Sequence, residues 1–223
     1  MLAPMSTIAG QLAFVVGSYH LLKHNKGKGV MIGHMDDMDP RVVTVIGAGV
    51  AGTQSILKAI DNKALVKVVD SSQSKLDDLK SKYGTENIEY ILSSKDSIQV
   101  SVNESDLVIG SVYVVGKEAP KVVTKDMLSS MNPGTVMVDV SIDQGGCFET
   151  SKPTTHDSPT FLENDIVHYC VTNMPGAVPL TATEALNKVS LSYVENLANN
   201  GIQNALDSDE HLRNGLNILD GRI

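Results

Sequence analysis

The sequence predicts an α/β protein, a Rossmann-like doubly wound parallel sheet followed by C-terminal helices. Short apolar runs rich in β-branched residues alternate with helical patterns between residues 42 and 171, the order of a parallel sheet with helical crossovers. A glycine-rich turn directly follows the first of these runs. Beyond residue 179 the alternation gives way to continuous helical periodicity. We therefore expect a Rossmann-like domain at residues 1–178 and a C-terminal helical segment at residues 179–223.

The chain begins with a helical pattern. Apolar residues spaced three and four apart predict an amphipathic helix at residues 6–22, with Ser6 as its N-cap. Residues 23–41 are rich in Lys, Gly, His and Asp and predict a loop. The first 16 residues lack the basic leading segment of a signal peptide, and polar residues with Pro4 argue against a membrane span.

The remaining elements follow in alternating order up to the last strand. Strands are predicted at residues 42–46, 65–69, 88–92, 107–109, 136–140 and 166–171. Helices are predicted at residues 50–60, 74–83, 124–131, 181–199 and 202–207. Thr124 marks the start of the third of these helices, and Pro133 with Gly134 ends it.

The composition excludes several functions. Hydrophobic residues make up 42% of the 223 and charged residues 20%, which is typical of a soluble globular protein. The formal charge of -8 disfavours nucleic acid as a partner, because a negative surface repels phosphate backbones. Cys147 and Cys170 lack the spacing of a metal site or a disulfide framework. We expect no metal, no membrane partner and a cytoplasmic location.

Three glycines in the turn after the first strand indicate a dinucleotide. Gly47 permits a tight turn, Gly49 lets a pyrophosphate approach the backbone, and Gly52 allows close packing of helix on strand. Val50 opens the helix, whose N-terminal N–H groups favour negative charge. The placement between a predicted strand and a predicted helix is what a dinucleotide-binding turn requires.

Asp70 ends the second predicted strand, where an acid accepts hydrogen bonds from the adenosine ribose and repels a 2′-phosphate. We therefore expect NAD rather than NADP, bound by the domain at residues 1–178. The alternative is a glycine-rich turn with an Asp that caps the next helix. Ser74 and Lys75 lie where adenosine-side contacts would form, although a lysine on a helix face is more often a solvated charge.

Two further turns follow buried strands, and the carboxyl ends of such strands face the ligand crevice of a doubly wound sheet. Asp143 lies in the turn after residues 136–140, either as a turn-forming residue or as a group near the nicotinamide. Asn173 lies in the turn after residues 166–171, which either reaches the same crevice or is an ordinary loop.

Three other polar residues are expected to be structural. Asp139 is interpreted as an acid at a strand end. His156 and His168 have no identifiable carboxylate or nucleophile beside them, so we assign neither a catalytic role.

Several separated blocks resemble the bacterial alanine dehydrogenases. The longest reads VDVSIDQGGCFETSKPTTH at residues 138–156. The others are Leu2-Ala3-Pro4-Met5-Ser6 with Ala9-Gly10, Asp106-Leu107-Val108-Ile109-Gly110, Ala119-Pro120-Lys121 and Asn173-Met174-Pro175-Gly176. The resemblance extends from Met1 to about Ile223. It implies reversible oxidative deamination of L-alanine to pyruvate and ammonia with NAD, in a homo-oligomer.

The resemblance also assigns roles to residues of this chain. Besides the glycines and Val50, it implies cofactor contacts at Ser6, Asp70, Lys75, Ser93, Val112, Tyr113, Ile142, Val171, Thr172, Asn173 and Met174. Asp143 resembles the catalytic aspartate of that family.

The chain departs from that family in one respect. Family members begin with a further segment of roughly a domain's size, which carries their substrate-binding lysine and arginine and their catalytic histidine. No residue here matches those three, so we expect the isolated chain to be catalytically incomplete unless a separate N-terminal fragment supplies them. The alternatives are a noncatalytic NAD-binding module and the nucleotide-binding part of a transhydrogenase, whose partner would be a membrane assembly.

Overall fold

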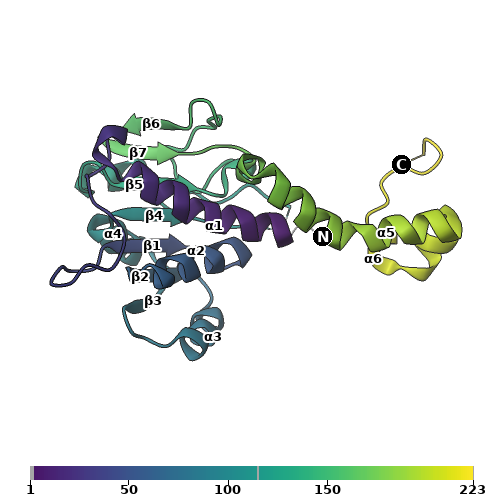
Figure 1. Ribbon diagram of the computed structural model, residues 1–223, viewed down its shortest axis with the longest axis horizontal. Coiled ribbons are helices and arrows are strands. Elements are labelled where there is room, and N and C mark those ends of the chain that lie inside the picture. Colours follow the sequence, from purple (N-terminus) through teal and green to yellow (C-terminus); the bar gives the residue numbers. More distant parts are fainter. Residues whose placement is uncertain (1–2, 115, 223) are drawn as a thin grey trace. The chain divides into compact units, whose positions relative to one another are not determined.

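A seven-stranded sheet forms the centre of a computed structural model that describes residues 3–114 and 116–222 (Figure 1). The strands are β1 (Val42–Ile46), β2 (Leu65–Asp70), β3 (Ile88–Leu92), β4 (Leu107–Gly110), β5 (Val136–Asp139), β6 (Thr160–Glu163) and β7 (Ile166–Tyr169). Their order across the sheet is β3-β2-β1-β4-β5-β7-β6. Neighbours pair in parallel, except that β6 runs antiparallel to β7. This confirms the doubly wound, Rossmann-like sheet.

Helices cover both faces of the sheet. The described helices are α1 (Ala3–His20), α2 (Val50–Asp61), α3 (Gln73–Tyr83), α4 (Lys95–Glu104), α5 (Pro179–Ser208) and α6 (Glu210–Asn214), with 3₁₀ helices at Lys23–Asn25, Lys125–Ser130, Ile142–Gln144 and Met174–Ala177. Those that pack on the sheet are α1 to α4. One apolar cluster joins the sheet to α1 and α2 through residues such as Phe14 and Ile56. A second cluster joins the opposite face to α4 through Ile98 and Val102.

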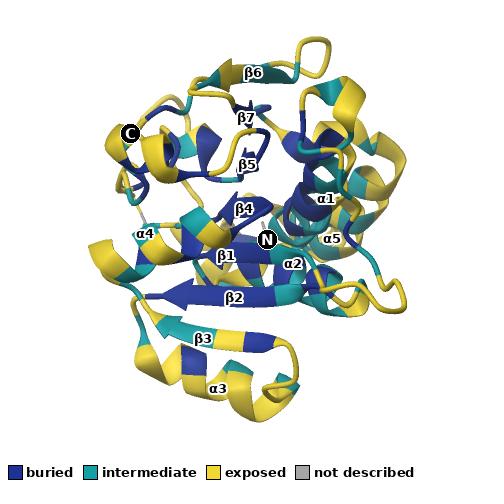
Figure 2. Ribbon diagram, turned by 90° about the vertical axis from the view of Figure 1, so that its left-hand side faces the viewer, coloured by how far each residue is buried: buried dark blue, intermediate teal, exposed yellow. Residues whose placement is uncertain are grey.

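The central strands are largely apolar because both faces of the sheet are covered. In β4, Leu107 and Ile109 belong to the first cluster and Val108 to the second, and all three are fully buried. Successive side chains of a strand point to opposite faces, so a strand between two helical layers alternates only in direction and not in polarity. Figure 2 shows the central strands as the most completely buried part of the sheet.

Glycines allow α1 to pack closely on its neighbours. A Cβ on Gly10 would lie 2.0 Å from the carbonyl oxygen of Ala51, at the start of α2. A Cβ on Gly17 would lie 2.5 Å from the Leu107 side chain. The Ser55 hydroxyl donates to the Gly10 carbonyl at 2.7 Å, which fixes the two helices in register.

Helix α1 begins earlier than predicted. It starts at Ala3, so Ser6 lies inside the helix and the prediction that Ser6 caps it is wrong. Pro4 does not interrupt it, because the first turn of a helix needs no N–H donor from that residue. Leu2, the first residue of the corresponding sequence block, lies outside the described residues.

Other elements also differ from their predictions. The segment predicted as a helix at 124–131 is the 3₁₀ helix Lys125–Ser130, and Thr124 precedes it without a side-chain capping bond. The last parallel strand ends at Tyr169, two residues before the predicted end at Val171. Helix α4, edge strand β6 and short helix α6 were not predicted.

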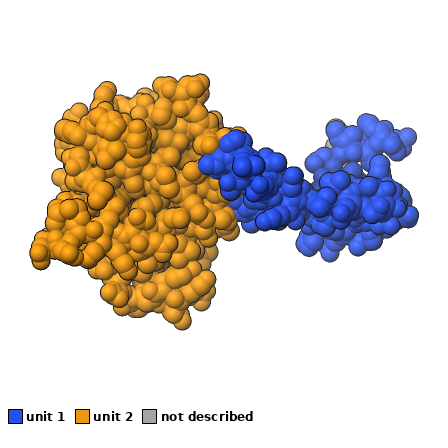
Figure 3. All heavy atoms as spheres, in the orientation of Figure 1, with its two compact units in different colours: residues 1–5, 178–223 blue, residues 6–177 orange. Residues whose placement is uncertain are grey.

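The chain divides into two compact units, Ser6–Ala177 and Val178–Ile223 with Met1–Met5 (Figure 3). The first contains the whole sheet. In the second, α5 is interrupted at Gly201, whose φ of 73° and ψ of 165° are not helical, which agrees with the predicted break after residue 199. None of the helices described between residues 3 and 222 combines the length and apolar character of a membrane span.

Candidate cofactor-binding site

The turn between β1 and α2 has the geometry of a dinucleotide-binding turn. Gly47 has a φ of +98°, and a Cβ there would lie 2.7 Å from the Ser111 carbonyl oxygen. A Cβ on Gly52 would lie only 1.8 Å from the Gly47 carbonyl oxygen. Gly49, by contrast, is the N-cap of α2 and has no atom within 4 Å of a Cβ position. Packing therefore requires glycine at positions 47 and 52. Gly49 leaves open space at the N-terminus of α2, whose first residue is Val50.

Asp70 holds this turn in place. Its carboxylate is almost fully buried and accepts hydrogen bonds from the Ala48 N–H at 2.7 Å and the Ser72 N–H at 2.9 Å. The acid thus joins the glycine turn to the residue that caps α3. The Lys75 ammonium lies 3.9 Å from the same carboxylate and is half exposed. Each carboxylate oxygen has a further lone pair with which it can accept a hydrogen bond from a ligand.

Ser93 and the Val112–Tyr113 pair follow the ends of β3 and β4. The Ser93 N–H donates to the Asp70 carbonyl at 2.9 Å, so this turn lies beside the acid. The Val112 carbonyl accepts a hydrogen bond from the Ser141 hydroxyl at 2.8 Å, which joins the turn after β4 to the turn after β5. The Tyr113 side chain is 65% exposed, as a side chain on the rim of a crevice would be.

The turns after β5 and β7 contact each other. Ile142 is buried, whereas Asp143, the next residue, is exposed. The Asp143 carboxylate accepts a hydrogen bond from the Asn173 N–H at 3.3 Å. Asn173 has a φ of 51°, a left-handed conformation that Asn tolerates better than most residues. The structure therefore brings together the two turns that the sequence assigned to one crevice.

The other predicted contacts in this region differ in exposure. Val171 and Met174 are buried in the first apolar cluster, so their side chains pack into the core. Thr172 is partly exposed. Ser6 is partly buried on α1, one turn before Gly10, the residue that packs against the start of α2. Ser6 therefore lies on the helix that flanks the glycine turn.

The two histidines have different surroundings. His168 is fully buried, and its ring nitrogens lie 2.8 Å from the Thr150 hydroxyl and 3.1 Å from the Ile166 carbonyl. Burial lowers the pKa of His168, which favours the neutral ring and agrees with the expected structural role. His156 is exposed, and its ring lies 3.3 Å from the Asn173 carbonyl. Sequence reasoning did not place His156 beside a crevice turn.

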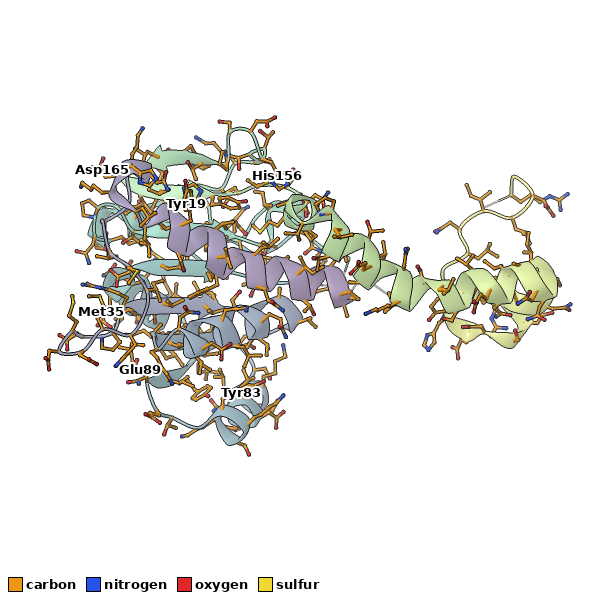
Figure 4. All side chains as sticks on the ribbon, viewed as in Figure 1. Tyr19, Met35, Tyr83, Glu89, His156 and Asp165 are labelled. Atoms are coloured by element: carbon orange, nitrogen blue, oxygen red, sulfur yellow. The ribbon has the colours of Figure 1, made fainter. Side chains whose placement is uncertain are left out.

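Two hollows of the surface lie away from these residues. Both adjoin the segment after α1; one is lined by His20, His24 and Phe161, and the other by Lys23, Gly134 and Asp165. Asp165 precedes β7, whereas Asn173 follows it, so the second hollow lies at the amino-terminal ends of the strands. Figure 4 labels Asp165 and His156 toward opposite ends of the sheet. The hollows therefore do not coincide with the candidate site.

The cysteines give no alternative site. Both are free and buried. Burial raises the pKa of the Cys147 thiol well above its usual value and that of Cys170 to about 12, so both are protonated at neutral pH. Across residues 3–114 and 116–222, no group of three His, Cys, Asp or Glu side chains is arranged to hold a metal ion.

The mostly parallel sheet has a glycine turn after β1 and an acid at the end of β2. Hydrogen bonds join the turns after β4, β5 and β7. These features define a dinucleotide-binding domain of the Rossmann class. The family model described as "Alanine dehydrogenase/PNT, C-terminal domain" matches residues 13–223, and the chain belongs to this family.

Relatives match along the whole chain. This chain is 48% identical to "Alanine dehydrogenase" of Halomonas elongata and 46% identical to that of Mycolicibacterium smegmatis. Both alignments cover 100% of this chain and 60% of the relative. A solved L-alanine dehydrogenase matches with a TM-score of 0.96 at 42% identity, covering 100% of this chain and 61% of that one. A transhydrogenase from Sinorhizobium meliloti matches with a TM-score of 0.80 at 21% identity, covering 95% of this chain and 60% of that one. At this identity the match shows the fold alone.

Proposed function

We propose that this chain is the NAD-binding part of an alanine dehydrogenase, which converts L-alanine, NAD and water to pyruvate, ammonia and NADH. The glycine turn anchored by the buried Asp70 carboxylate carries the proposal. The relatives at 42–48% identity bear the name alanine dehydrogenase. The chain spans 60% of their length, so the reaction, L-alanine and pyruvate belong to the proposal.

The first half of the sheet fits the adenosine side of NAD. The N-terminus of α2 presents N–H groups without intrahelical partners, and the space beside Gly49 is open to a pyrophosphate. Asp70 has free lone pairs for ribose hydroxyls, and its negative charge disfavours a 2′-phosphate. Lys75 and Ser93 lie next to Asp70, where they would border the adenosine.

The second half of the sheet fits the nicotinamide side. NAD, when bound, supplies the acceptor for the hydride that leaves the substrate. Val112, Tyr113 and Ile142 would border the nicotinamide nucleotide, together with the turn that contains Asn173. Asp143 is the exposed acid of this surface, and we assign it the catalytic position next to the reacting carbon. Its bond from Asn173 fixes the carboxylate between two turns.

We further propose a cytoplasmic homo-oligomer as the working form. The resemblance to alanine dehydrogenases supports this, as do exposed apolar side chains such as Val15, Leu191 and Val194, which are suited to contact with other protein. Residues that bind the substrate carboxylate and transfer protons are proposed to lie in the additional N-terminal segment of such proteins or in a companion chain.

The first test is binding of NADH and NADPH to the purified chain by calorimetry. We expect NADH to bind and NADPH to bind at least about tenfold more weakly, because Asp70 disfavours the 2′-phosphate. Asp70→Asn should reduce this preference, whereas Asp78→Asn, an exposed acid on α3, should leave it unchanged. Absence of NADH binding by the folded chain would refute the proposal.

The second test is alanine-dependent formation of NADH. We expect the 223-residue chain alone to show no measurable turnover, and turnover to appear in a protein that also contains the N-terminal segment of a relative. A chain that binds NADH but stays inactive in that longer protein would favour the noncatalytic module instead.

A further inference from the structure

A fully buried carboxylate lies at the end of β5, four residues before Asp143. Asp139 has no exposed surface and stands opposite Gly110 of β4 in the sheet register. Its oxygens accept hydrogen bonds from the N–H groups of Ser141 at 3.0 Å, Cys147 at 2.8 Å and Phe148 at 3.3 Å. The Ser151 hydroxyl adds a fourth bond at 2.5 Å. The Cys147 thiol, 3.5 Å from Oδ1, is a fifth donor, so five donors converge on this one carboxylate.

The donors come from both ends of one turn. Ser141 begins the segment, and Cys147 and Ser151 end it, so the carboxylate closes residues 140–151 into a loop. The chain wraps tightly around the acid, since a Cβ on Gly146 would lie 2.7 Å from its Oδ2. Removing the acceptor would leave buried N–H groups without partners, which is costly enough to shift the backbone.

The closed turn carries the groups that face the crevice. Asp143 bonds to Asn173 after β7, and the Ser141 hydroxyl bonds to the Val112 carbonyl after β4. Strands β4, β5 and β7 form the second half of the sheet, while the glycine turn and Asp70 belong to the first half. A dinucleotide lies across both halves, so the surface organised by this turn meets only its second nucleotide.

We propose that Asp139 is a positioning residue that holds Ile142 and Asp143 in place for the nicotinamide nucleotide without touching the cofactor. This inference rests on the proposed binding of NAD. Burial raises the pKa of Asp139, and the hydrogen bonds from Ser151, Phe148 and Cys147 oppose that shift. The acid therefore acts through hydrogen bonds to the turn, and its position excludes direct contact with a ligand in the crevice.

The test compares NADH with ADP-ribose, which contains the adenosine side and the pyrophosphate but lacks the nicotinamide. In Asp139→Asn, one carboxylate oxygen becomes an NH₂ group that faces N–H or O–H donors, so the turn must rearrange. We expect the Kd of NADH to rise about tenfold while the Kd of ADP-ribose stays within about twofold. The shift in NADH fluorescence on binding should also decrease, because it reports the surroundings of the nicotinamide.

Asp106→Asn is the matched control. Asp106 is also a buried acid of the central sheet, paired with Lys28 at 2.9 Å and accepting from the Val42 N–H at 3.1 Å. It precedes β4, whereas Asp139 ends β5, so the two acids lie at opposite ends of adjacent strands. We expect Asp106→Asn to lower thermal stability while leaving the ratio of the two Kd values unchanged.

Ser151→Ala is a milder second variant, because it removes one donor and keeps the carboxylate. We expect Ser151→Ala to raise the Kd of NADH about threefold and to leave the Kd of ADP-ribose unchanged. This variant tests the proposal if Asp139→Asn does not fold. The positioning role would be overturned if the folded variants bound NADH and ADP-ribose equally more weakly, or if the Kd of neither ligand changed. A wild-type chain that binds ADP-ribose but not NADH would also overturn it, whereas one that binds neither would refute the proposed function itself.

Discussion

The sheet region, residues 6–177, and the helical region, residues 178–222, differ in how much of their apolar side-chain surface is buried. In the sheet region, Ile109 and Val138 are completely buried within clusters that its own helices close. In the helical region, Leu180 is 73% exposed, and Leu191 and Val194 are more than half exposed. The sheet region thus encloses a core of its own, whereas the helical region has apolar surface suited to contact with further protein.

This difference should be visible in substitutions, and the glycine turn gives the largest expected effect. Gly52→Ala places a Cβ 1.8 Å from a backbone oxygen, so the turn must open. We expect a loss of at least about 3 kcal/mol in the free energy of unfolding and of all detectable NADH binding. Gly201→Ala, in a glycine of α5 with open space around it, should leave NADH binding unchanged. Calorimetric titration measures NADH binding, and urea unfolding measures the free energy of unfolding. Normal NADH binding by Gly52→Ala would contradict the packing argument.

Truncation of a large side chain gives the next largest effect. Ile109→Ala removes buried volume between sheet and helices and should cost about 3 kcal/mol in the free energy of unfolding. Leu191→Ala removes a side chain that is 55% exposed and should cost less than about 0.5 kcal/mol. Urea unfolding followed by circular dichroism separates the two. Similar losses would mean that Leu191 is buried in solution, for example against a second copy of the chain.

Protonation of buried His168 at low pH should destabilise the sheet region by less than either of the two destabilising substitutions, Gly52→Ala and Ile109→Ala. Burial lowers the pKa of His168 below 6.5, so its contribution to stability is present above pH 6.5 and is lost as the pH falls through the folded-state pKa. Between about pH 7.5 and 5.5 we expect the free energy of unfolding to fall by roughly 1 kcal/mol more in the wild type than in His168→Gln. Exposed His211, in the helical region, provides the control variant His211→Gln, which should keep the wild-type pH dependence.

The sequence predicts best the elements that are buried on both sides. The strands from 42 to 140 and the glycine turn follow from continuous β-branched runs and from glycine chemistry. Helix α4 was missed because its buried face consists mainly of Ile98 and Val102, and its start relies on reciprocal bonds between Ser94 and Ser97. Strand β6 was missed because an edge strand is partly exposed and lacks a continuous apolar run.

The candidate site was predictable to the extent that it follows strand ends. Asp70 and Asp143 lie where the pattern of a doubly wound sheet places ligand-facing turns. The donors to Asp139 could not be predicted, because Cys147, Phe148 and Ser151 reach it only after the chain bends back on itself. The position of His156 beside Asn173 depends on the same tertiary folding.

Strand β6 also affects how the protein behaves at high concentration. An edge strand has unpaired backbone groups that can recruit other chains into aggregates. β6 has four residues, and its Glu163 pairs with Lys125 at 2.9 Å and Lys152 at 3.8 Å. The Lys152 ammonium also lies 5.4 Å from the centre of the Phe161 ring. Short length and local charge at this edge should discourage fibril-like stacking of sheets.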